Sequence, residues 1–302
     1  RSEVRRPAGL DETKPDNLDF GINITQIMRL CRFETNGKAQ AGFYFGSNIV
    51  PAAAAARAVR ENTDHKPELP ESDDLLPLMA HGTKHEDAKL VAQWLESNEG
   101  SVAKLAAEGA HLRTPVPRPN KLFLLAGNYA KHIEEGGGIA VARQKTFPYV
   151  FMKPASTALN HPDADIAIPE VSPDHIDWEC ELAFVIGKKA KGVKEVDALK
   201  HVAGYTVVND ISDREFKPNP KREERKNDGF FDWLHGKWHD GFCPVGPCVT
   251  SAEAISDPQK LRLTLKVNGE IKQDSSTAMQ IFPVAAVIEF ISSYVTLEPG
   301  DI

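Results

Sequence analysis

The pattern of apolar and polar residues in the first third of the chain predicts a hairpin followed by helices. Short β-like runs occupy residues 29–33 and 42–46, with the turn signal Asn36-Gly37 between them, and this arrangement is typical of a β-hairpin. Residues 52–60 and 86–108 favour helix, because apolar residues in the longer segment recur at near-helical spacing. We therefore expect a small α+β unit at this end of the chain.

Further along, residues 176–186 predict a buried strand that carries two carboxylates on one face. Side chains two positions apart on a strand point the same way, so Glu179 and Glu181 share a face. The other face is apolar and consists of Trp178, Cys180, Leu182, Phe184 and Ile186. Two acids in such surroundings repel each other and lose hydration, so they need a cation or a proton. A bound metal ion would neutralise both carboxylates, and we expect one here.

Prolines divide the chain into two predicted domains. Residues 114–119 carry three prolines in alternate positions, which interrupt a helix and favour an extended linker. We place a domain boundary near residue 115, with a small N-terminal domain at 24–115 and a larger domain at 120–302. Residues 1–23 are charged, contain proline and lack periodicity, so we expect a loose or disordered arm there.

Composition narrows the class of protein. The 302 residues are 41% hydrophobic and 26% charged, with a net charge of −7 and a pI near 5.8. This balance argues against broad nucleic-acid binding, and no apolar run approaches the roughly 18 residues of a membrane span. Four scattered cysteines indicate a reducing compartment rather than a disulfide framework. We expect a cytoplasmic protein, although a chain that begins at Arg1 is compatible with a removed leader.

A short helix is expected after the apolar strand at 121–126. Asn128 is a candidate N-cap, and the glycines at 136–138 end the helix after about two turns. Within it, His132 and Glu135 are three apart and share a face, so the carboxylate can orient the imidazole. This is the layout of a general-base dyad on a hinged lid. A surface pair without function would have the same spacing, and both interpretations stay open.

Two more polar residues stand where chemistry is often found. Asp210 ends a β-branched strand at 204–209, although an aspartate that only forms a turn would look the same. Lys237 lies between a glycine and a tryptophan in an aromatic-rich segment. In such surroundings a lysine can polarise a carbonyl or hold a carboxylate, and a lysine that extends to the surface is an equal alternative.

Three motifs in this order and spacing resemble the fumarylacetoacetate hydrolase family. They are Gly127-Asn128-Tyr129-x-x-His132-x-x-Glu135, Asp177-x-Glu179-x-Glu181-Leu182 and Asn209-Asp210-x-Ser212-x-Arg214. Residues 121–302 resemble the C-terminal domain of that family, and the preceding part resembles the small N-terminal domain of many members. The resemblance implies an α+β, β-dominated fold: a mixed β-roll behind a small α+β domain, generally assembled as a homodimer. Family members usually continue beyond Ile302, so we expect the family domain to be truncated at its C-terminal end.

The resemblance also implies roles for individual residues. Three carboxylates match the metal ligands of the family, two residues match its water-activating dyad, and one lysine matches its active-site lysine. The ligands are Glu179, Glu181 and Asp210, the dyad is His132 and Glu135, and the lysine is Lys237. Arg214, Lys153, Lys217 and Tyr129 are expected on the substrate side. Three carboxylate ligands suit Mg²⁺, Mn²⁺ or Ca²⁺ better than zinc.

The implied reaction is hydrolytic cleavage of a carbon–carbon bond in a small 2,4-dioxo acid, of the acylpyruvate or fumarylpyruvate type. A metal-stabilised enolate would be the leaving group, and the dyad would activate water. An oxaloacetate decarboxylase or tautomerase, or a 2-oxo acid hydratase, could use the same platform. A dimeric binding protein that keeps the fold without catalysis is a further alternative. The expected partner is a small 2-oxo acid, with neither nucleic acid nor membrane.

Overall fold

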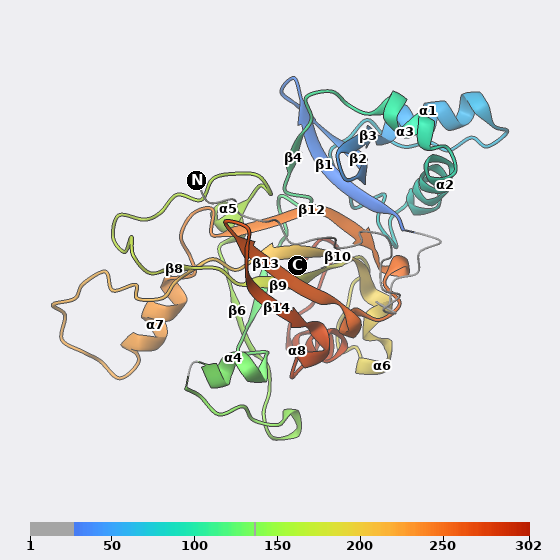
Figure 1. Cartoon of the computed structure of the whole chain (residues 1–302). Helices are drawn as coiled ribbons and strands as arrows, with labels where there is room; N and C mark the ends of the chain where they lie inside the picture. Colours follow the sequence, from blue (N-terminus) through green and yellow to red (C-terminus); the bar gives the residue numbers. More distant parts are fainter. Residues whose placement is uncertain (1–26, 136) are drawn as a thin grey trace, which may run out of the picture.

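The largest sheet among the described residues has eight strands, and the other elements lie around it (Figure 1). The computed structural model describes residues 27–135 and 137–302, so the arm expected at 1–23 lies outside the described residues. The strand order is β3-β2-β1-β12-β10-β9, with β4 beside β1 and β7 beside β12, and every pairing except β12 with β7 is antiparallel. These strands are β1 (Arg29–Thr35), β2 (Lys38–Phe45), β3 (Asn48–Pro51), β4 (His111–Arg113), β7 (Leu159–Asn160), β9 (Cys180–Ile186), β10 (Val202–Asn209) and β12 (Cys243–Ser251).

The hairpin predicted from the first third of the chain is confirmed. β1 and β2 pair antiparallel up to Thr35 opposite Lys38, which leaves the two-residue turn Asn36-Gly37. Asn36 and Gly37 have φ angles of 51° and 75°. Positive φ at both central residues is the signature of a type I′ turn, whose twist matches that of the flanking strands.

The helix predicted over 86–108 is wrong as one continuous element. The structure has α1 (Ala52–Asn62) as expected, but then two helices, α2 (His85–Glu96) and α3 (Glu99–Leu105). The break falls at Asn98, whose side-chain amide donates to the carbonyl of Trp94 at 2.7 Å. An asparagine side chain that satisfies a helix-end carbonyl competes with continuation of the helix.

The large sheet crosses the predicted domain boundary. β1 pairs with β12, with Leu30 opposite Val249, and one core cluster contains residues from both sides, including Leu30 and Val245. The two predicted domains therefore share a sheet and a core, while their division near residue 115 stays a prediction. The α+β, β-dominated class is confirmed.

The remaining elements surround this sheet. Three two-stranded pairs are formed by β5 (Phe123–Ala126) with β6 (Tyr149–Met152), β8 (Ile176–Asp177) with β11 (Ser212–Asp213), and β13 (Arg262–Val267) with β14 (Glu270–Ser276). The other helices are α4 (Ala130–Glu135), α5 (Ala155–Ala158), α6 (Glu195–Ala198), α7 (Asp228–His235) and α8 (Val284–Tyr294). A second core cluster forms around α8 and includes Ile186 and Ile288. Within the described ranges, every helix is too short or too polar to cross a membrane.

Candidate active site

The strand predicted over 176–186 is interrupted, and the interruption shapes the site. β8 ends at Asp177 and β9 begins at Cys180, so Trp178 and Glu179 lie between them. The amide of Glu179 donates to the side chain of Asn209 at 2.9 Å, and its carbonyl accepts from the amide of Asp210 at 2.9 Å. Glu179 is thereby fixed beside the end of β10, where Asp210 follows the last strand residue.

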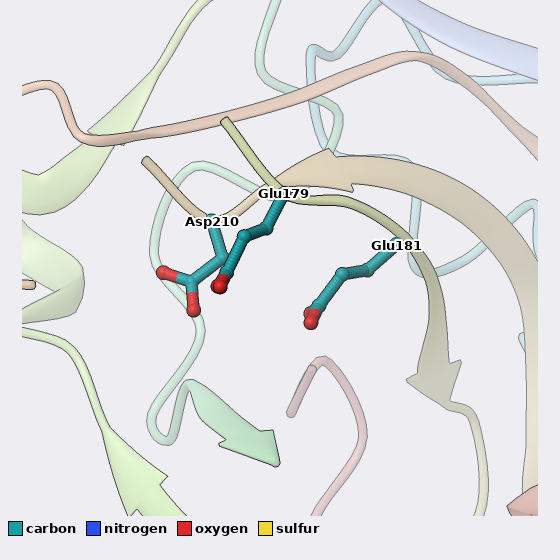
Figure 2. A group of neighbouring side chains, drawn as sticks. All are labelled: Glu179, Glu181 and Asp210. Atoms are coloured by element: carbon teal, nitrogen blue, oxygen red, sulfur yellow. The ribbon is translucent and has the colours of Figure 1, made fainter. Parts of the chain in front are cut away.

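Three carboxylates meet at this point (Figure 2). Oxygen atoms of Glu179, Glu181 and Asp210 all lie within 4.8 Å of one another. Burial raises the pKa of Glu181 well above its usual value, and the nearby charges of Asp210 and Glu179 raise it further. Burial is also the main cause that raises the pKa of Asp210, which is fully buried. The predicted pairing of the two glutamates is thus present, and Asp210 adds a third acid.

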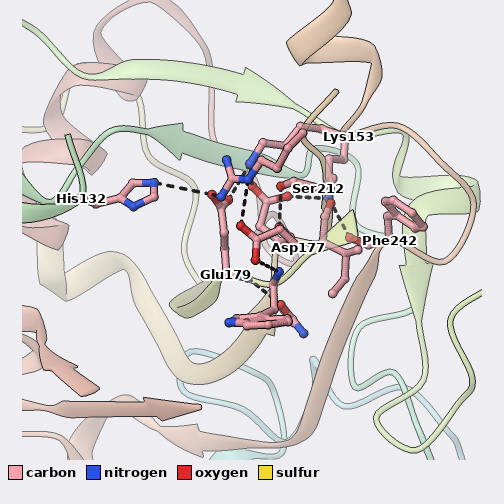
Figure 3. Close-up of polar contacts among 12 residues, drawn as sticks. His132, Lys153, Asp177, Glu179, Ser212 and Phe242 are labelled. Atoms are coloured by element: carbon pink, nitrogen blue, oxygen red, sulfur yellow. Dashed lines mark hydrogen bonds and ion pairs between the residues drawn. The ribbon is translucent and has the colours of Figure 1, made fainter. Parts of the chain in front are cut away.

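Lys237 and Arg214 form ion pairs with acids of this triad, and Figure 3 shows the polar contacts around Glu179. Lys237 Nζ lies 2.5 Å from Glu179 Oε2 and 2.6 Å from Asp210 Oδ2. Arg214 donates to Glu179 Oε1 at 2.6 Å and to Asp177 Oδ2 at 3.0 Å. Burial opposes ionisation of Glu179, but the charges of Lys237 and Arg214 outweigh it and lower the pKa of Glu179. Glu179 is therefore an anion, while Glu181 has no hydrogen bond or ion pair among the described residues.

The substrate-side role expected for Lys153 is wrong. Its side chain is 0% exposed, and its Nζ lies 2.5 Å from Asp210 Oδ1. The same ammonium donates to the carbonyls of Ile211 at 2.8 Å and Phe242 at 2.6 Å. All of its donors are used inside the protein, so Lys153 supports Asp210 from behind and does not reach a substrate. Lys217 is exposed and does not line the cavity described below.

Replacing Lys153 by methionine should destabilise the protein by about 3–5 kcal/mol, because it leaves a buried carboxylate with one fewer counter-charge and removes a donor from the carbonyls of Ile211 and Phe242. Urea unfolding followed by circular dichroism measures this change. Lys217→Met is the matched control, since that lysine is exposed, and should stay within about 0.5 kcal/mol of the wild type. A loss below about 1 kcal/mol for Lys153→Met would contradict the role assigned to it.

The segment that carries His132 is anchored at its start. The expectation that Asn128 is an N-cap is wrong, because both polar groups of the Asn128 side chain bond to the backbone of Phe282. The amide group of Asn128 donates to Phe282 O at 3.0 Å, and its oxygen accepts from Phe282 N at 2.9 Å. The adjacent Tyr129 accepts from Gln280 at 3.2 Å, and burial raises the pKa of Tyr129 to about 12. These contacts attach the base of α4 to the segment before α8.

His132 and Glu135 lie on α4 without contacting each other. His132 Nε2 is 3.7 Å from Glu179 Oε1, and Glu135 lies 3.9 Å from Lys131. Among the described residues, no hydrogen bond or ion pair joins His132 to Glu135. Both side chains are more than half exposed, and α4 has no buried residue. The structure therefore brings His132 to the triad, while the dyad stays a prediction.

A cavity of about 420 Å³ opens onto these groups. Its polar lining includes Tyr129, His132, Glu135, Glu179, Glu181, Arg214 and Lys237. Asp210 lies behind this wall and contacts Lys237 and Lys153. Of the residues expected at the site, only Asp210, Lys153 and Lys217 do not line the cavity.

Sequence reasoning missed two groups that shape this wall. Gln273 on β14 accepts a hydrogen bond from the amide of Cys180 at 2.8 Å, which holds the strand between the two glutamates. Asp177 stands out in the sequence only as part of a motif, yet it fixes Arg214. The hairpin turn at Asn268-Gly269 could have indicated that β14 folds back, but nothing local indicates which strand it would meet.

The triad fits a hard divalent cation. Asp210 Oδ1 is buried, and it contacts the ammonium of Lys153 at 2.5 Å. Glu181 has no hydrogen bond or ion pair in the described part of the chain. Three carboxylates with free lone pairs, and no histidine or cysteine within the triad, are the donor set preferred by Mg²⁺, Mn²⁺ and Ca²⁺ rather than zinc. The group is therefore a candidate divalent-metal centre.

The raised pKa of Glu181 predicts a pH dependence of stability without metal. Because the folded protein keeps this proton at pH values where the unfolded chain has lost it, stability should fall as pH rises above about 4.5. Glu181→Gln removes the titration, so in chelator its Tm should exceed that of the wild type by a margin that grows from pH 5 to pH 8. Glu135→Gln, at an exposed position, should follow the wild type. Parallel curves for Glu181→Gln and the wild type would contradict the prediction.

The sequence of the chain matches one family model and is similar to known enzymes. The sequence model described as fumarylacetoacetate (FAA) hydrolase C-terminal matches residues 121–302. The mitochondrial oxaloacetate tautomerase fahd2 of Xenopus laevis is 38% identical over 208 residues, which is 69% of this chain and 60% of that protein. The 2,4-didehydro-3-deoxy-L-rhamnonate hydrolase of Sphingomonas sp. (strain SKA58) is 40% identical over 188 residues, 62% of this chain and 61% of that protein. The chain thus spans about three fifths of these relatives.

The fold of the chain is also similar to solved structures of two hydrolases. The maleylpyruvate hydrolase of Sphingobium sp. SYK-6, in complex with manganese(II) and pyruvate, matches with a TM-score of 0.62 and 27% identity, over 91% of this chain and 86% of that chain. The fumarylacetoacetate hydrolase of Exiguobacterium antarcticum matches with a TM-score of 0.65 and 25% identity, over 91% and 84%. Since the tautomerase relative is mitochondrial, the cytoplasmic location stays a prediction.

Proposed function

This chain belongs to the fumarylacetoacetate hydrolase family, and from that premise we propose that it is a divalent-metal-dependent enzyme acting on a small 2-oxo acid through an enolate. One observation carries the proposal. Glu179, Glu181 and Asp210 converge within 4.8 Å beside a cavity that also exposes Lys237, Arg214 and His132. An acidic metal site next to fixed cations suits an anionic substrate whose transition state gains negative charge.

A divalent ion, with Mg²⁺ or Mn²⁺ as the first candidates, would supply a Lewis acid that stabilises negative charge on a keto oxygen. Side chains of the protein would bind the substrate and transfer the proton. Arg214 and Lys237 would neutralise the carboxylate of the substrate, and both are already oriented by Glu179. His132, which is within 3.7 Å of Glu179 Oε1, would accept or deliver the proton.

The first candidate reaction is hydrolytic cleavage of a carbon–carbon bond in an acylpyruvate. Both members of the expected dyad line the cavity, so closure of α4 would bring His132 and Glu135 to a water beside the substrate. Catalytic hydrogen bonds often form only in the substrate complex. Similarity to the rhamnonate-derivative and maleylpyruvate hydrolases supports this reaction.

The second candidate reaction is keto–enol tautomerisation of oxaloacetate. It needs proton transfer at the carbon next to the keto group but no attacking water. His132 alone near the triad, without a contact to Glu135, meets that need. Similarity to the tautomerase relatives supports it.

A substrate panel tests the proposal. Protein freed of metal with a chelator would be supplied with Mg²⁺, Mn²⁺ or Ca²⁺ and offered acetylpyruvate, fumarylpyruvate and oxaloacetate. Loss of the ultraviolet absorbance of the dioxo acid with release of pyruvate indicates hydrolysis, and faster enol-to-keto conversion of oxaloacetate indicates tautomerisation. No turnover of any 2-oxo acid, together with no calorimetric binding of Mn²⁺, would favour a non-catalytic binding protein instead.

A homodimer is part of the same proposal. Large apolar side chains are exposed on β6 and around α7, among them Met152, Phe230, Phe231 and Trp238. Exposed apolar groups that cluster on a surface are typical of interfaces. Light scattering during gel filtration should give twice the mass of one chain, and a monomer at micromolar concentration would contradict the dimer.

A further inference from the structure

Two cysteines face each other where the N-terminal hairpin joins the rest of the sheet. β1 and β12 pair antiparallel, with Arg29 opposite Thr250 and Leu30 opposite Val249. The pairing ends at Leu30 and Val249, and Cys31 and Cys248 are the next residues on the two strands. The pair joins two strands that are distant in sequence, one on each side of the boundary predicted near residue 115.

The pair lies at a position where cross-strand disulfides are geometrically accessible. The amide of Ser251 donates to the carbonyl of Met28, which makes these opposite residues a hydrogen-bonded pair. Hydrogen-bonded and non-hydrogen-bonded pairs alternate along antiparallel strands, so the step after Leu30 and Val249, which Cys31 and Cys248 occupy, has the phase of a non-hydrogen-bonded pair. Such pairs have Cα atoms about 4.5 Å apart with side chains close together, within the range of about 4.4–6.8 Å seen for disulfides.

The two side chains also share one small environment. Cys31 and Cys248 belong to the same buried cluster, with Phe33 and Ile49, on the face of the hairpin away from the main core. Burial raises the pKa of both thiols, and proximity to Cys248 raises that of Cys31 further. Both are free thiols. The shared cluster and the mutual electrostatic effect place the sulfur atoms on the same side of the sheet.

We propose that Cys31 and Cys248 are a redox-modifiable pair that hydrogen peroxide converts into a disulfide, which covalently joins β1 to β12. This site is separate from the acidic triad, and the proposal does not depend on the reaction the enzyme catalyses. Its effect is on the attachment of the N-terminal hairpin to the catalytic part of the chain.

The two thiols have different roles in the reaction. Cys248 is 9% exposed and Cys31 is 0% exposed, so peroxide reaches Cys248 first. After the Cys248 thiol loses its proton, its sulfur attacks one peroxide oxygen, the O–O bond breaks, and the departing hydroxide takes up the proton, so sulfenic acid and water form. The sulfur of Cys31 then attacks the sulfur of the Cys248 sulfenic acid and the S–O bond breaks. The sulfenic hydroxyl leaves with the proton of the Cys31 thiol as a second water. Two thiols are oxidised by two electrons, and one peroxide is reduced to two waters.

The other two cysteines serve as internal references. Cys243 lies on the same strand as Cys248 and is fully buried, but it stands beside Leu159 of β7. Cys180 is partly exposed and lies opposite Asn209 of β10. Neither has a cysteine across the sheet, so peroxide should not convert either one into an intramolecular disulfide.

Mass spectrometry after peroxide treatment tests the proposal. The full chain carrying Cys180→Ser, which removes the partly exposed thiol, would be treated under native conditions, alkylated and digested. The expected product is a Cys31–Cys248 cross-linked peptide that has lost two hydrogens and disappears on reduction. Cys243 should stay a free thiol during peroxide treatment and should therefore be found alkylated in the digest.

Two single variants in the same background test the order of events. With Cys31→Ser, oxidation should stop at the sulfenic acid of Cys248, which dimedone traps. With Cys248→Ser, no dimedone adduct should form at Cys31. The cross-link closes a long loop, so it should raise the Tm of the oxidised protein by roughly 5–10 °C relative to the reduced protein. Mn²⁺ affinity should stay the same in both forms.

Two outcomes would overturn the proposal. One is the absence of the cross-linked peptide after treatment that fully converts an exposed thiol in a reference peptide. The other is a cross-link that joins different cysteines, such as Cys243 to Cys248. Both outcomes are independent of the substrate panel, so failure here leaves the proposed function untouched.

Discussion

Replacing Asp210 by asparagine is expected to remove divalent-metal binding and turnover together. Asp210 supplies one of three charges in the triad, and both of its oxygens face ammonium groups, those of Lys153 and Lys237. An amide carries no charge and would point its NH₂ group at one of these lysines. We expect Mn²⁺ affinity to fall at least about 100-fold, and kcat/KM to fall about 10³-fold or more, because both metal ligation and charge stabilisation are lost.

Calorimetric titration with Mn²⁺ and steady-state kinetics measure the two effects. Asp177→Asn is the matched control, because Asp177 is a neighbouring acid that contacts Arg214 but lies outside the triad. It should keep its Mn²⁺ affinity within a few-fold of the wild type. Unchanged Mn²⁺ binding by a folded Asp210→Asn protein would show that the ion binds somewhere else.

Replacing His132 by alanine should have a different signature, with turnover lost and metal binding kept. His132 lies on α4, and its ring approaches the triad only through a 3.7 Å contact with Glu179. The helix has no buried residue, so the fold should tolerate the change. Loss of a general acid or base typically costs about 10²–10⁴-fold in rate, and we expect kcat to fall in that range with Mn²⁺ affinity unchanged.

Variants of two glutamates on the same helix test what surrounds His132. Glu134→Gln changes an exposed residue that does not line the cavity, and it should behave like the wild type. If His132 and Glu135 pair in the substrate complex, Glu135→Gln should lower kcat and shift its pH profile. Full activity of His132→Ala would exclude His132 as the proton-transfer residue, and full activity of Glu135→Gln alone would exclude the dyad.

Much of the candidate site could be predicted because it depends on local rules. The alternation of side chains along a strand is enough to put Glu179 and Glu181 on one face, and the two do share the cavity wall. The turn residues Asn36-Gly37 specify the hairpin, since few other residues tolerate positive φ at both positions. Burial of two acids implies a cation, a general consequence of desolvation.

The predictions that failed depended on contacts between distant parts of the chain. Lys153 was expected on the substrate side, but its partners are the carbonyls of Ile211 and Phe242, 58 and 89 residues away. Asn128 was expected to cap its own helix, yet it bonds to Phe282, 154 residues on. The helix predicted over 86–108 is an exception, because its cause is local. The helix ends early where the side-chain amide of Asn98 donates to the carbonyl of Trp94 in the last turn.

The sequence by itself therefore determined which side chains point the same way and which acids need a counter-charge, because strand geometry and desolvation act over a few residues. Only the tertiary structure decided which cation meets which acid. Three carboxylates attract every nearby cation alike, and the choice of Lys237 and Arg214 at the cavity and Lys153 behind it was made by the strands and loops that carry them. The pairing of β1 with β12 likewise brought Cys31 and Cys248 into one buried cluster, which no local pattern could have specified.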